Sequence, residues 1–258
     1  MQKLGLNEIV EATKGELIFG DLSKGISGIC TDSRKVAEGN LFIPLKGENF
    51  DGHAFIEDCF KKGATASLTS EVADGINAVE GKALIKVEDT LAALGDIARY
   101  YRGLFDIPLV GITGSVGKTS TKDMIACVLQ QKFNVLKTSG NFNNHIGLPL
   151  TVMNLERDHE AAVLEMGMSG LGEISYLTKI AKPQIAVITN IGMSHIEKLG
   201  SKQNILKAKM EIMEGLPDDG IVILNGDDSL LYGLKGFLKY KTIYYGTEEG
   251  LDLQAYNI

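Results

Sequence analysis

Apolar segments of strand length alternate with segments of helical length from residue 108 onward, and this alternation limits the chain to few folds. Uninterrupted apolar strands such as IAVITNI (185–191) and GIVILN (220–225) indicate a sheet that is buried on both faces. Such a sheet is parallel and flanked by helices, with right-handed crossovers. The predicted strands are 108–113, 133–138, 161–166, 185–191, 220–225 and 241–246, and the predicted helices are 117–131, 170–181, 201–215 and 227–239.

The residues before this alternation predict a smaller domain of mixed α/β type. The chain has 258 residues, 44% of them hydrophobic, which is enough for two cores. Asp89 is a candidate N-cap of a helix that leads into the larger domain. We therefore predict one domain at 1–86 and another at 87–258. In the first, strands are expected at 40–45, 64–70 and 83–87, and a helix at 53–62.

The segment GITGSVGKTS (111–120) joins a predicted strand to a predicted helix and has the composition of a phosphate-binding loop. Gly114 and Gly117 allow backbone N–H groups to face phosphate oxygens at the helix N-terminus. Lys118 would bridge the β- and γ-phosphates, and Thr119 would offer its hydroxyl to Mg²⁺. The usual motif, G-x-x-x-x-G-K-[ST], begins with a glycine where this chain has isoleucine. The larger domain is therefore predicted to be a mostly parallel sheet of the P-loop ATPase type, flanked by helices.

Two polar residues lie at or beyond the ends of predicted strands, at the edge where parallel sheets bind ligands. Glu165 comes directly after the apolar letters AVL, and a carboxylate beside glycines can hold Mg²⁺. His195 follows the strand at 185–191. An imidazole can bind a metal, but Mg²⁺ prefers oxygen, so spacing alone favours a polar loop residue at His195.

Three further features each allow two interpretations. The stretch SGNFNNHIGLPLT contains asparagines that suit recognition of polar groups but also form turns. These are Asn141, Asn143 and Asn144. In LNGDD, either Asn225 or Asp227 can cap the helix that follows instead of binding a ligand. Lys209 lies in a lysine-rich helix, and such a run usually marks a solvated face.

The smaller domain contains a polar stretch, TDSRKVAEGNLFIPLKGENFDGH (31–53), around its first predicted strand. It is dense in hydroxyl, amide and charged groups. Ser33, Arg34 and Lys46 would suit an anionic ligand with several hydroxyl groups.

Composition excludes several classes of function. The 26 basic and 33 acidic residues give a net charge of −7, without a stripe of lysine and arginine, so no nucleic acid partner is expected. Cys30, Cys59 and Cys127 are odd in number and widely spaced, which favours reduced thiols in a cytosolic protein. The N-terminus lacks the apolar core of a signal peptide, and no apolar run approaches the ~20 residues that span a bilayer. We expect a cytoplasmic protein with no membrane insertion.

Several stretches together resemble the Mur ligases, the ATP-dependent amide-forming enzymes of peptidoglycan precursor synthesis. TGSVGKTST (113–121) is similar to the family signature T-G-[ST]-x-G-K-T-[ST], which lacks the first glycine of the usual loop. Within the family, the likeness is to the type that joins D-alanyl-D-alanine to UDP-N-acetylmuramoyl-tripeptide, and it runs along essentially the whole chain. The stretches that carry it are TDSRKVAEGNLFIPLKGENFDGH, GNFNNHIGLPLT, LEMGMSGLGEI and NIGMSHIEKLGS.

The resemblance implies an ATP site with two Mg²⁺ ions. Lys118 would bind the β- and γ-phosphates, and Thr119 and Glu165 would hold one ion. His195 would lie at the second ion together with Lys209, which many family members carry as an anionic carbamate. The implied ATP-binding residues are Gly114, Ser115, Val116, Gly117, Lys118, Thr119, Ser120 and, near the adenosine, Asn225.

The resemblance also implies where the UDP-sugar peptide binds. Ser33 and Arg34, with Lys46 and the FDGH segment, match the region that receives the UDP-sugar, so residues 1–86 would be the substrate domain. Asn144 lies in a loop that would face nucleotide and substrate. The implied substrate-binding residues are Ser33, Arg34, Lys46, Asp51, His53, Asn141 and Asn144.

The implied reaction forms an amide bond in two steps. The terminal carboxylate of UDP-N-acetylmuramoyl-tripeptide attacks the γ-phosphate of ATP, and the amine of D-alanyl-D-alanine then displaces phosphate from the acyl phosphate. Family members have a third, C-terminal domain that closes over ATP, and this chain ends before it. We therefore expect the chain as given to bind the UDP substrate, to bind ATP weakly and to be poor in ligation. The complete enzyme is expected to be a monomer.

Three rival functions are considered. A sister ligase, MurE-like or folylpolyglutamate synthetase-like, would share the phosphate loop and Mg²⁺ groups but add another amino acid. A non-catalytic nucleotide-binding module would use UDP-sugar or ATP as a signal, and the retained Lys118 and Glu165 argue against it. A P-loop GTPase would carry an N-K-x-D stretch for guanine, which this sequence lacks.

Overall fold

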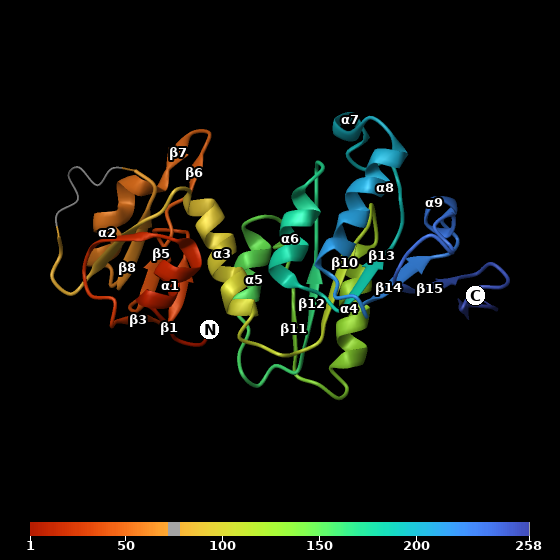
Figure 1. The fold of residues 1–258 in the computed structure, drawn as a ribbon, viewed down its shortest axis with the longest axis horizontal. Coiled ribbons are helices and arrows are strands. Elements are labelled where there is room, and N and C mark those ends of the chain that lie inside the picture. The colour runs from red at the N-terminus through yellow and green to blue at the C-terminus, as the bar shows by residue number, and fades with distance from the viewer. Residues whose placement is uncertain (72–77, 258) are drawn as a thin grey trace. The chain divides into compact units, whose positions relative to one another are not determined.

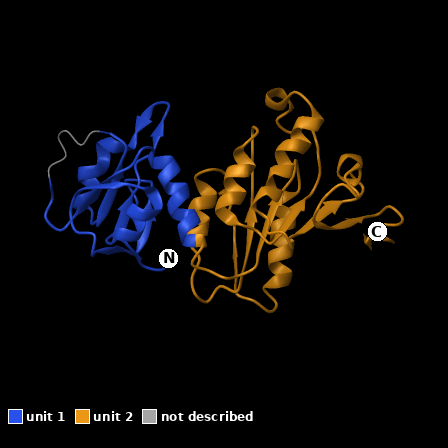
Figure 2. Ribbon diagram, in the orientation of Figure 1, with its two compact units in different colours: residues 1–101 blue, residues 102–258 orange. Residues whose placement is uncertain are grey.

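The protein divides into two compact units, residues 1–101 and 102–258, shown in Figure 2. The computed structural model describes residues 1–71 and 78–257. Unit 1 is a small mixed α/β domain, and unit 2 is a parallel sheet flanked by helices (Figure 1). The predicted fold class is confirmed.

The compact units divide after Tyr101 and not after residue 86, where the sequence predicts the domain boundary. The cause is α3 (Thr90–Arg102), which packs with unit 1 rather than opening the larger domain. Tyr100 donates its hydroxyl to Glu8 Oε1 at 2.7 Å, and the Tyr101 hydroxyl accepts from Gln2 N at 2.6 Å. These aromatic side chains connect the helix to the start of the chain.

Unit 1 is built on one five-stranded sheet. Its elements are β1 (Leu4–Gly5), α1 (Leu6–Thr13), β2 (Glu16–Phe19), β3 (Gly25–Ile26), β4 (Gly28–Cys30), β5 (Asn40–Phe42), β6 (Lys46–Gly47), β7 (Phe50–Asp51), the 3₁₀ turn η1 (Gly52–Phe55), α2 (Ile56–Lys61), β8 (Ala66–Thr69), β9 (Ala83–Lys86) and α3. The sheet has the order β2-β9-β8-β5-β4, and only the β2–β9 pair is antiparallel. The predicted strands correspond to β5, β8 and β9, and the predicted helix to η1 and α2. Ile56 and Phe60 of α2 pack against Phe42 and Leu84 of the sheet.

Unit 2 is built on a seven-stranded parallel sheet. Its elements are β10 (Leu109–Thr113), α4 (Lys118–Leu129), β11 (Val135–Lys137), α5 (Gly147–Val152), β12 (Ala161–Glu165), α6 (Glu173–Ala181), β13 (Ile185–Ile188), α7 (Ile196–Leu199), α8 (Lys202–Met210), the 3₁₀ turn η2 (Glu211–Gly215), β14 (Ile221–Asn225), α9 (Ser229–Tyr232), β15 (Lys241–Gly246) and β16 (Leu253–Gln254). The strand order is β11-β12-β10-β13-β14-β15-β16. All six predicted strands are present.

The centre of this sheet is buried on both faces, as its apolar sequence predicts. Every residue of β10 and β12 is buried. On one face, Ile112 and Val163 pack with Ala126 of α4. Because β10 lies between β12 and β13, the segments that follow these three strands emerge at one edge of the sheet.

All four helices predicted for unit 2 are shorter in the structure, those at 117–131 and 170–181 by three residues each and the other two by more. The helix expected at 227–239 is limited to α9 and is followed by turns, since Gly233 follows α9 directly and Gly236 has a left-handed φ of +84°. The helix expected at 201–215 is α8 up to Met210 and then η2. Within the described part of the chain, no helix is long and apolar enough to cross a membrane.

Candidate functional site

The loop between β10 and α4 is fixed by residues that follow β13. Ser115 N donates to the Asn190 carbonyl at 3.1 Å, and Val116 N donates to Asn190 Oδ1 at 3.1 Å. The Thr189 hydroxyl donates to the Val116 carbonyl at 2.6 Å. Gly114 has φ +153° and Gly117 has φ +81°, values that side chains disfavour. The segment after β13 therefore fixes the shape of this loop.

Replacing Gly114 with alanine is expected to lower the free energy of unfolding by about 2 kcal/mol or more, because the β-carbon would collide with the Thr189 hydroxyl. An alanine at Gly117 meets no atom within 4 Å, so only backbone strain of ~1 kcal/mol remains. Urea unfolding of the two variants measures the difference. Equal losses would show that the collision with Thr189 does not set the cost.

Glu165 lies beside this loop because of the strand register. It ends β12 and pairs with Ile112 of β10, two residues before the loop begins. Its side chain is 2% exposed. Glu165 Oε2 accepts from Thr119 Oγ1 at 2.9 Å, and Oε1 accepts from Asn143 Nδ2 at 2.7 Å. A carboxylate and a hydroxyl thus meet at the first turn of α4.

Two lysines approach the same loop. Lys118 Nζ donates to the Gly114 carbonyl at 3.0 Å and lies 3.5 Å from the Ser115 carbonyl. Lys209 is 2% exposed, and its ammonium makes no hydrogen bond or ion pair with residues 1–71 or 78–257. Burial, and then the charge of Lys118, lower the pKa of Lys209 to about 8. The solvated-face interpretation is wrong for Lys209, although it is correct for Lys207 in the same helix.

Three other predicted residues are not joined to Glu165. His195 is exposed at the start of α7, with φ +64°, and its imidazole makes no hydrogen bond with the described part of the chain. Asn144 Oδ1 accepts from Gly147 N at 2.8 Å, so its amide stabilises the start of α5. The Asn141 side chain is exposed.

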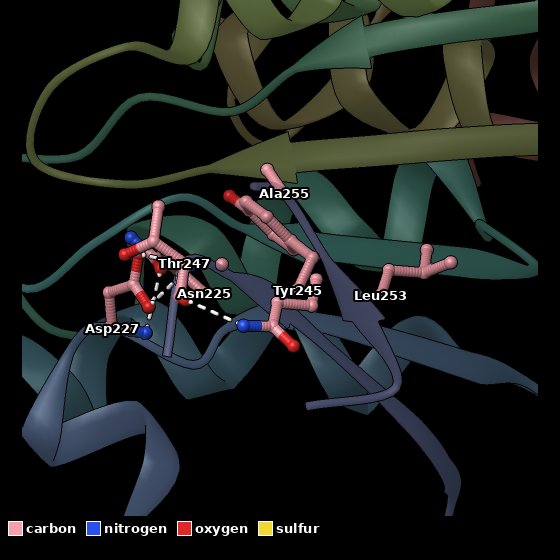
Figure 3. A pocket seen from close by; sticks show the side chains of 8 residues that line it. Asn225, Asp227, Tyr245, Thr247, Leu253 and Ala255 are labelled. Atoms are coloured by element: carbon pink, nitrogen blue, oxygen red, sulfur yellow. Dashed lines mark hydrogen bonds between the residues drawn. The ribbon is translucent and has the colours of Figure 1, made fainter. Parts of the chain in front are cut away.

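Asn225 lines a separate pocket of about 490 Å³ at the end of β14 and β15 (Figure 3). Its neighbours include Tyr245 and the Asp227 carboxylate, which accepts from Thr247 N at 2.9 Å. Asn225 Oδ1 accepts from Asp227 N at 3.0 Å, and the cap of α9 is the next residue, Asp228. Asp228 Oδ2 also accepts from Ile191 N at 2.7 Å, which connects α9 to the segment after β13.

Arg34 and Lys46 of unit 1 are each paired with acidic residues. Arg34 makes two 2.8 Å hydrogen bonds to the Asp32 carboxylate, which lower the pKa of Asp32, and Arg34 is largely exposed. Lys46 Nζ lies 3.2 Å from Asp51 Oδ2 and 3.3 Å from Glu71 Oε1, and both acids raise the pKa of Lys46.

The Ser33 carbonyl accepts from Lys62 Nζ at 2.9 Å, so the position of Ser33 is fixed through its backbone. This contact connects the segment after β4 to the end of α2. The Ser33 hydroxyl makes no hydrogen bond to the described part of the chain.

His53 holds the end of β8 in place. Ser70 N donates to His53 Nε2 at 3.1 Å, so this nitrogen is unprotonated and Nδ1 donates to Asp51 Oδ1 at 2.6 Å. The bonds from His53 lower the pKa of Asp51. Asp51, His53 and Glu71 offer possible metal ligands close together, but the Lys46 ammonium already lies between the two carboxylates. We read the group as a structural network.

Two further residues contact Glu165, and the sequence patterns do not single out either of them. Of the three asparagines in SGNFNNHIGLPLT, Asn143 is the one that contacts the carboxylate. Thr138 Oγ1 accepts from Glu165 N at 2.9 Å. Both residues follow β11, and a polar residue after a parallel strand was the signal that could have found them.

Comparison with known proteins decides the family. The sequence profile of the Mur ligase middle domain matches residues 112–258, and the profile described as Mur ligase family, catalytic domain, matches residues 25–102. The chain belongs to the Mur ligase family.

Similar Mur ligases are known from several bacteria. The UDP-N-acetylmuramoyl-tripeptide–D-alanyl-D-alanine ligase of Bacillus subtilis is 46% identical over 100% of this chain and 56% of its own length. A crystal structure of MurF from Acinetobacter baumannii superposes with a TM-score of 0.91 at 31% identity, covering 100% of this chain and 56% of that one. The crystal structure of MurF from Thermotoga maritima in complex with ADP superposes with a TM-score of 0.77 at 36% identity, covering 85% of this chain and 50% of that one. The chain thus spans about half the length of the relatives that it matches.

Proposed function

We propose that this Mur ligase chain provides the substrate- and ATP-binding units of a ligase that joins D-alanyl-D-alanine to UDP-N-acetylmuramoyl-tripeptide. The observation that carries the proposal is the meeting of the phosphate loop with a buried carboxylate, where Thr119 Oγ1 lies 2.9 Å from Glu165 Oε2. The reaction named for the B. subtilis relative and the ADP bound by the T. maritima protein support it.

The residues of the loop fit ATP with Mg²⁺. The N–H groups of Ser115 and Val116 donate to Asn190, so phosphate oxygens would be bound by N–H groups at Gly117 and the first turn of α4. The Thr119 hydroxyl and the Glu165 carboxylate are hard oxygen donors of the kind that Mg²⁺ prefers. When bound, Mg²⁺ would neutralise charge on the phosphates. Lys118 would exchange its loop carbonyls for phosphate oxygens.

Both proposed steps are attacks by substrate groups. The tripeptide carboxylate attacks the γ-phosphorus, the bond to ADP breaks, and the amine of D-alanyl-D-alanine then attacks the acyl carbon and releases phosphate and a proton. In each step negative charge develops on phosphoryl oxygens, and the Lys118 ammonium would stabilise it. The residues of this chain therefore act by charge and position rather than as nucleophiles.

Lys209 is proposed to carry a carbamate. An amine reacts with CO₂ only when it is neutral, and a pKa of about 8 leaves much of Lys209 neutral near pH 8. The reaction forms an N–C bond and releases one proton. The resulting anion would attract Lys118 where the ammonium repels it, and its oxygens would suit a second Mg²⁺. The role of His195 at that second ion rests on family resemblance, because its imidazole contacts neither Lys118 nor Lys209.

Unit 1 is proposed to bind the UDP-sugar peptide through Ser33, Arg34 and Lys46. The ion pairs of Arg34 and Lys46 have exposed cations, and such surface pairs contribute at most ~1 kcal/mol, so a diphosphate can displace the carboxylates. In unit 2, Asn225 and its pocket are proposed to receive the adenosine end of ATP.

Calorimetric titration tests the proposed function. UDP-N-acetylmuramoyl-tripeptide is expected to bind the chain at least ~10-fold more tightly than UDP-N-acetylglucosamine, because the peptide adds contacts, each tenfold being ~1.4 kcal/mol. Mg-ATP, titrated separately, should also bind. UDP-N-acetylmuramoyl-dipeptide is the matched control, because a sister ligase that adds the third residue would prefer it. Preference for the dipeptide, or no binding of either compound, would contradict the assignment.

A further inference from the structure

Lys122 is a buried lysine one helical turn after Lys118 on α4, and only 3% of it is exposed. Its Nζ donates to the Thr138 carbonyl at 2.8 Å and lies 3.4 Å from Asp123 Oδ1. Burial of an ammonium is unfavourable unless it is hydrogen-bonded or paired. Burial of the Lys122 ammonium therefore requires its hydrogen bond to the Thr138 carbonyl.

Thr138, which directly follows β11, is fully buried and contacts the backbone of β12 twice. Its N–H donates to the Val163 carbonyl at 3.1 Å, which extends the pairing of the two strands by one residue. Its Oγ1 accepts from Glu165 N at 2.9 Å. Thr138 thus binds the strand on both sides of Leu164 and fixes the point at which Glu165 leaves the sheet.

The segment after Thr138 supplies another contact of Glu165. Asn143 Nδ2 donates to Glu165 Oε1 at 2.7 Å, and the Asn143 carbonyl accepts from Gly167 N at 2.8 Å. This segment begins at Thr138, so the carbonyl that Lys122 binds is its anchor. Thr138 accepts from Glu165 N and Asn143 donates to Glu165 Oε1, and Lys122 holds the residue from which both contacts start.

We propose that Lys122 is a positioning residue for the Mg²⁺ site, because it holds Thr138 and thereby directs the Glu165 carboxylate toward Thr119. The inference rests on the proposed function, which assigns Glu165 to Mg²⁺. Pairing with Asp123 does not explain the burial of Lys122, since Lys137 Nζ lies 2.7 Å from the same carboxylate.

Lys137 offers a matched control for this proposal. It lies on β11 next to Thr138 and meets Asp123 like Lys122, but its ammonium makes no hydrogen bond to Thr138 among the described contacts. Loss of its charge should leave Glu165 in place.

The test compares calorimetric titrations of Mg-ATP and of ATP in excess EDTA. Lys122→Met keeps the length of the side chain and removes the ammonium. It is expected to weaken Mg-ATP binding about 10-fold, the effect found for residues that orient metal ligands, and to leave metal-free ATP binding within about twofold. Lys137→Met should leave both affinities within about twofold. If Lys122 had only a general structural role, Lys122→Met would weaken the binding of Mg-ATP and of metal-free ATP equally. That result, or an unchanged Mg-ATP affinity, overturns the proposal.

Thr138→Val tests the contact between Thr138 and Glu165, and it replaces Lys122→Met as the test if that variant does not fold. It removes the acceptor of Glu165 N and should give the same Mg²⁺-selective loss, while Thr138→Ser restores the hydroxyl and should recover binding. The double variant Lys122→Met/Thr138→Val should lose no more than the worse single variant, because both residues act on one carboxylate. If the losses of Mg-ATP affinity in the two single variants added up in the double variant, Lys122 would not act through Thr138 on Glu165.

The wild type separates this proposal from the proposed function. Mg²⁺-dependent ATP binding by the wild type, with an unchanged affinity in Lys122→Met, rejects the role of Lys122 alone. No Mg²⁺-dependent binding by the wild type rejects the proposed function and the role of Lys122 together.

Discussion

Glu165→Gln is expected to weaken the binding of Mg-ATP about 100-fold and to leave the binding of metal-free ATP within about twofold of the wild type. Mg²⁺ in nucleotide sites is usually bound through one or two carboxylates, and Glu165 is the carboxylate in contact with Thr119 of the phosphate loop. The glutamine keeps the volume of the side chain. Its amide oxygen can still accept from Asn143, so the loop should keep its position. Calorimetric titration with and without Mg²⁺ measures both affinities.

Glu57→Gln is the control for loss of one negative charge. Glu57 is exposed on α2 in the other unit, and both affinities should stay unchanged. If Glu165→Gln bound Mg-ATP as tightly as the wild type, the carboxylate would serve only to anchor Thr119 and Asn143. The proposed metal site would then be wrong.

The larger part of the fold could be predicted because its central strands are continuously apolar. β10 and β12 are buried on both faces, so their sequences differ clearly from the amphipathic helices around them. The strand order could not be predicted, since it depends on which crossover passes over which face. Unit 1 was harder, because β1, β3, β6 and β7 have two residues each and give no periodicity.

The loop between β10 and α4 could be located from the sequence because its glycines, Lys118 and Thr119 are contiguous. Contacts made through strand register could not be located in this way, and Asn143 and Thr138 meet Glu165 only because β11 and β12 are neighbours. Lys209 was misjudged from charge composition. Its spacing held the correct signal, since Ile205 and Ala208 place residue 209 on the buried face of α8.

Lys209→Met is expected to raise the free energy of unfolding by ~3 kcal/mol at pH 7 in CO₂-free buffer. The ordinary pKa of a lysine is 10.5, and burial with repulsion from Lys118 lowers that of Lys209 to about 8. At pH 7 the ammonium is present in both the folded and the unfolded chain, so the full cost of burying it is paid in the folded state. Methionine fills similar space without a charge.

The gain should shrink as pH rises. Between about 8 and 10.5 the unfolded chain keeps a proton that the folded chain has lost, so the stability of the wild type increases with pH. Above 10.5 both states are neutral and the two proteins should differ little. Lys207→Met, exposed on the same helix, is the control and should stay within about 0.5 kcal/mol of the wild type throughout.

Bicarbonate connects this titration to the proposed carbamate. Near pH 8 about half of Lys209 is neutral and able to react with CO₂, so ¹³C-labelled bicarbonate should give a carbamate signal in the wild type that is absent from Lys209→Met. The wild type should gain stability from bicarbonate at this pH, because an anion beside Lys118 replaces a repelling ammonium. Urea unfolding gives the free energy of unfolding of both proteins at each pH. If the difference between wild type and Lys209→Met stayed constant from pH 7 to 10, Lys209 would titrate as an ordinary lysine. The carbamate would then lack the neutral amine from which it must form.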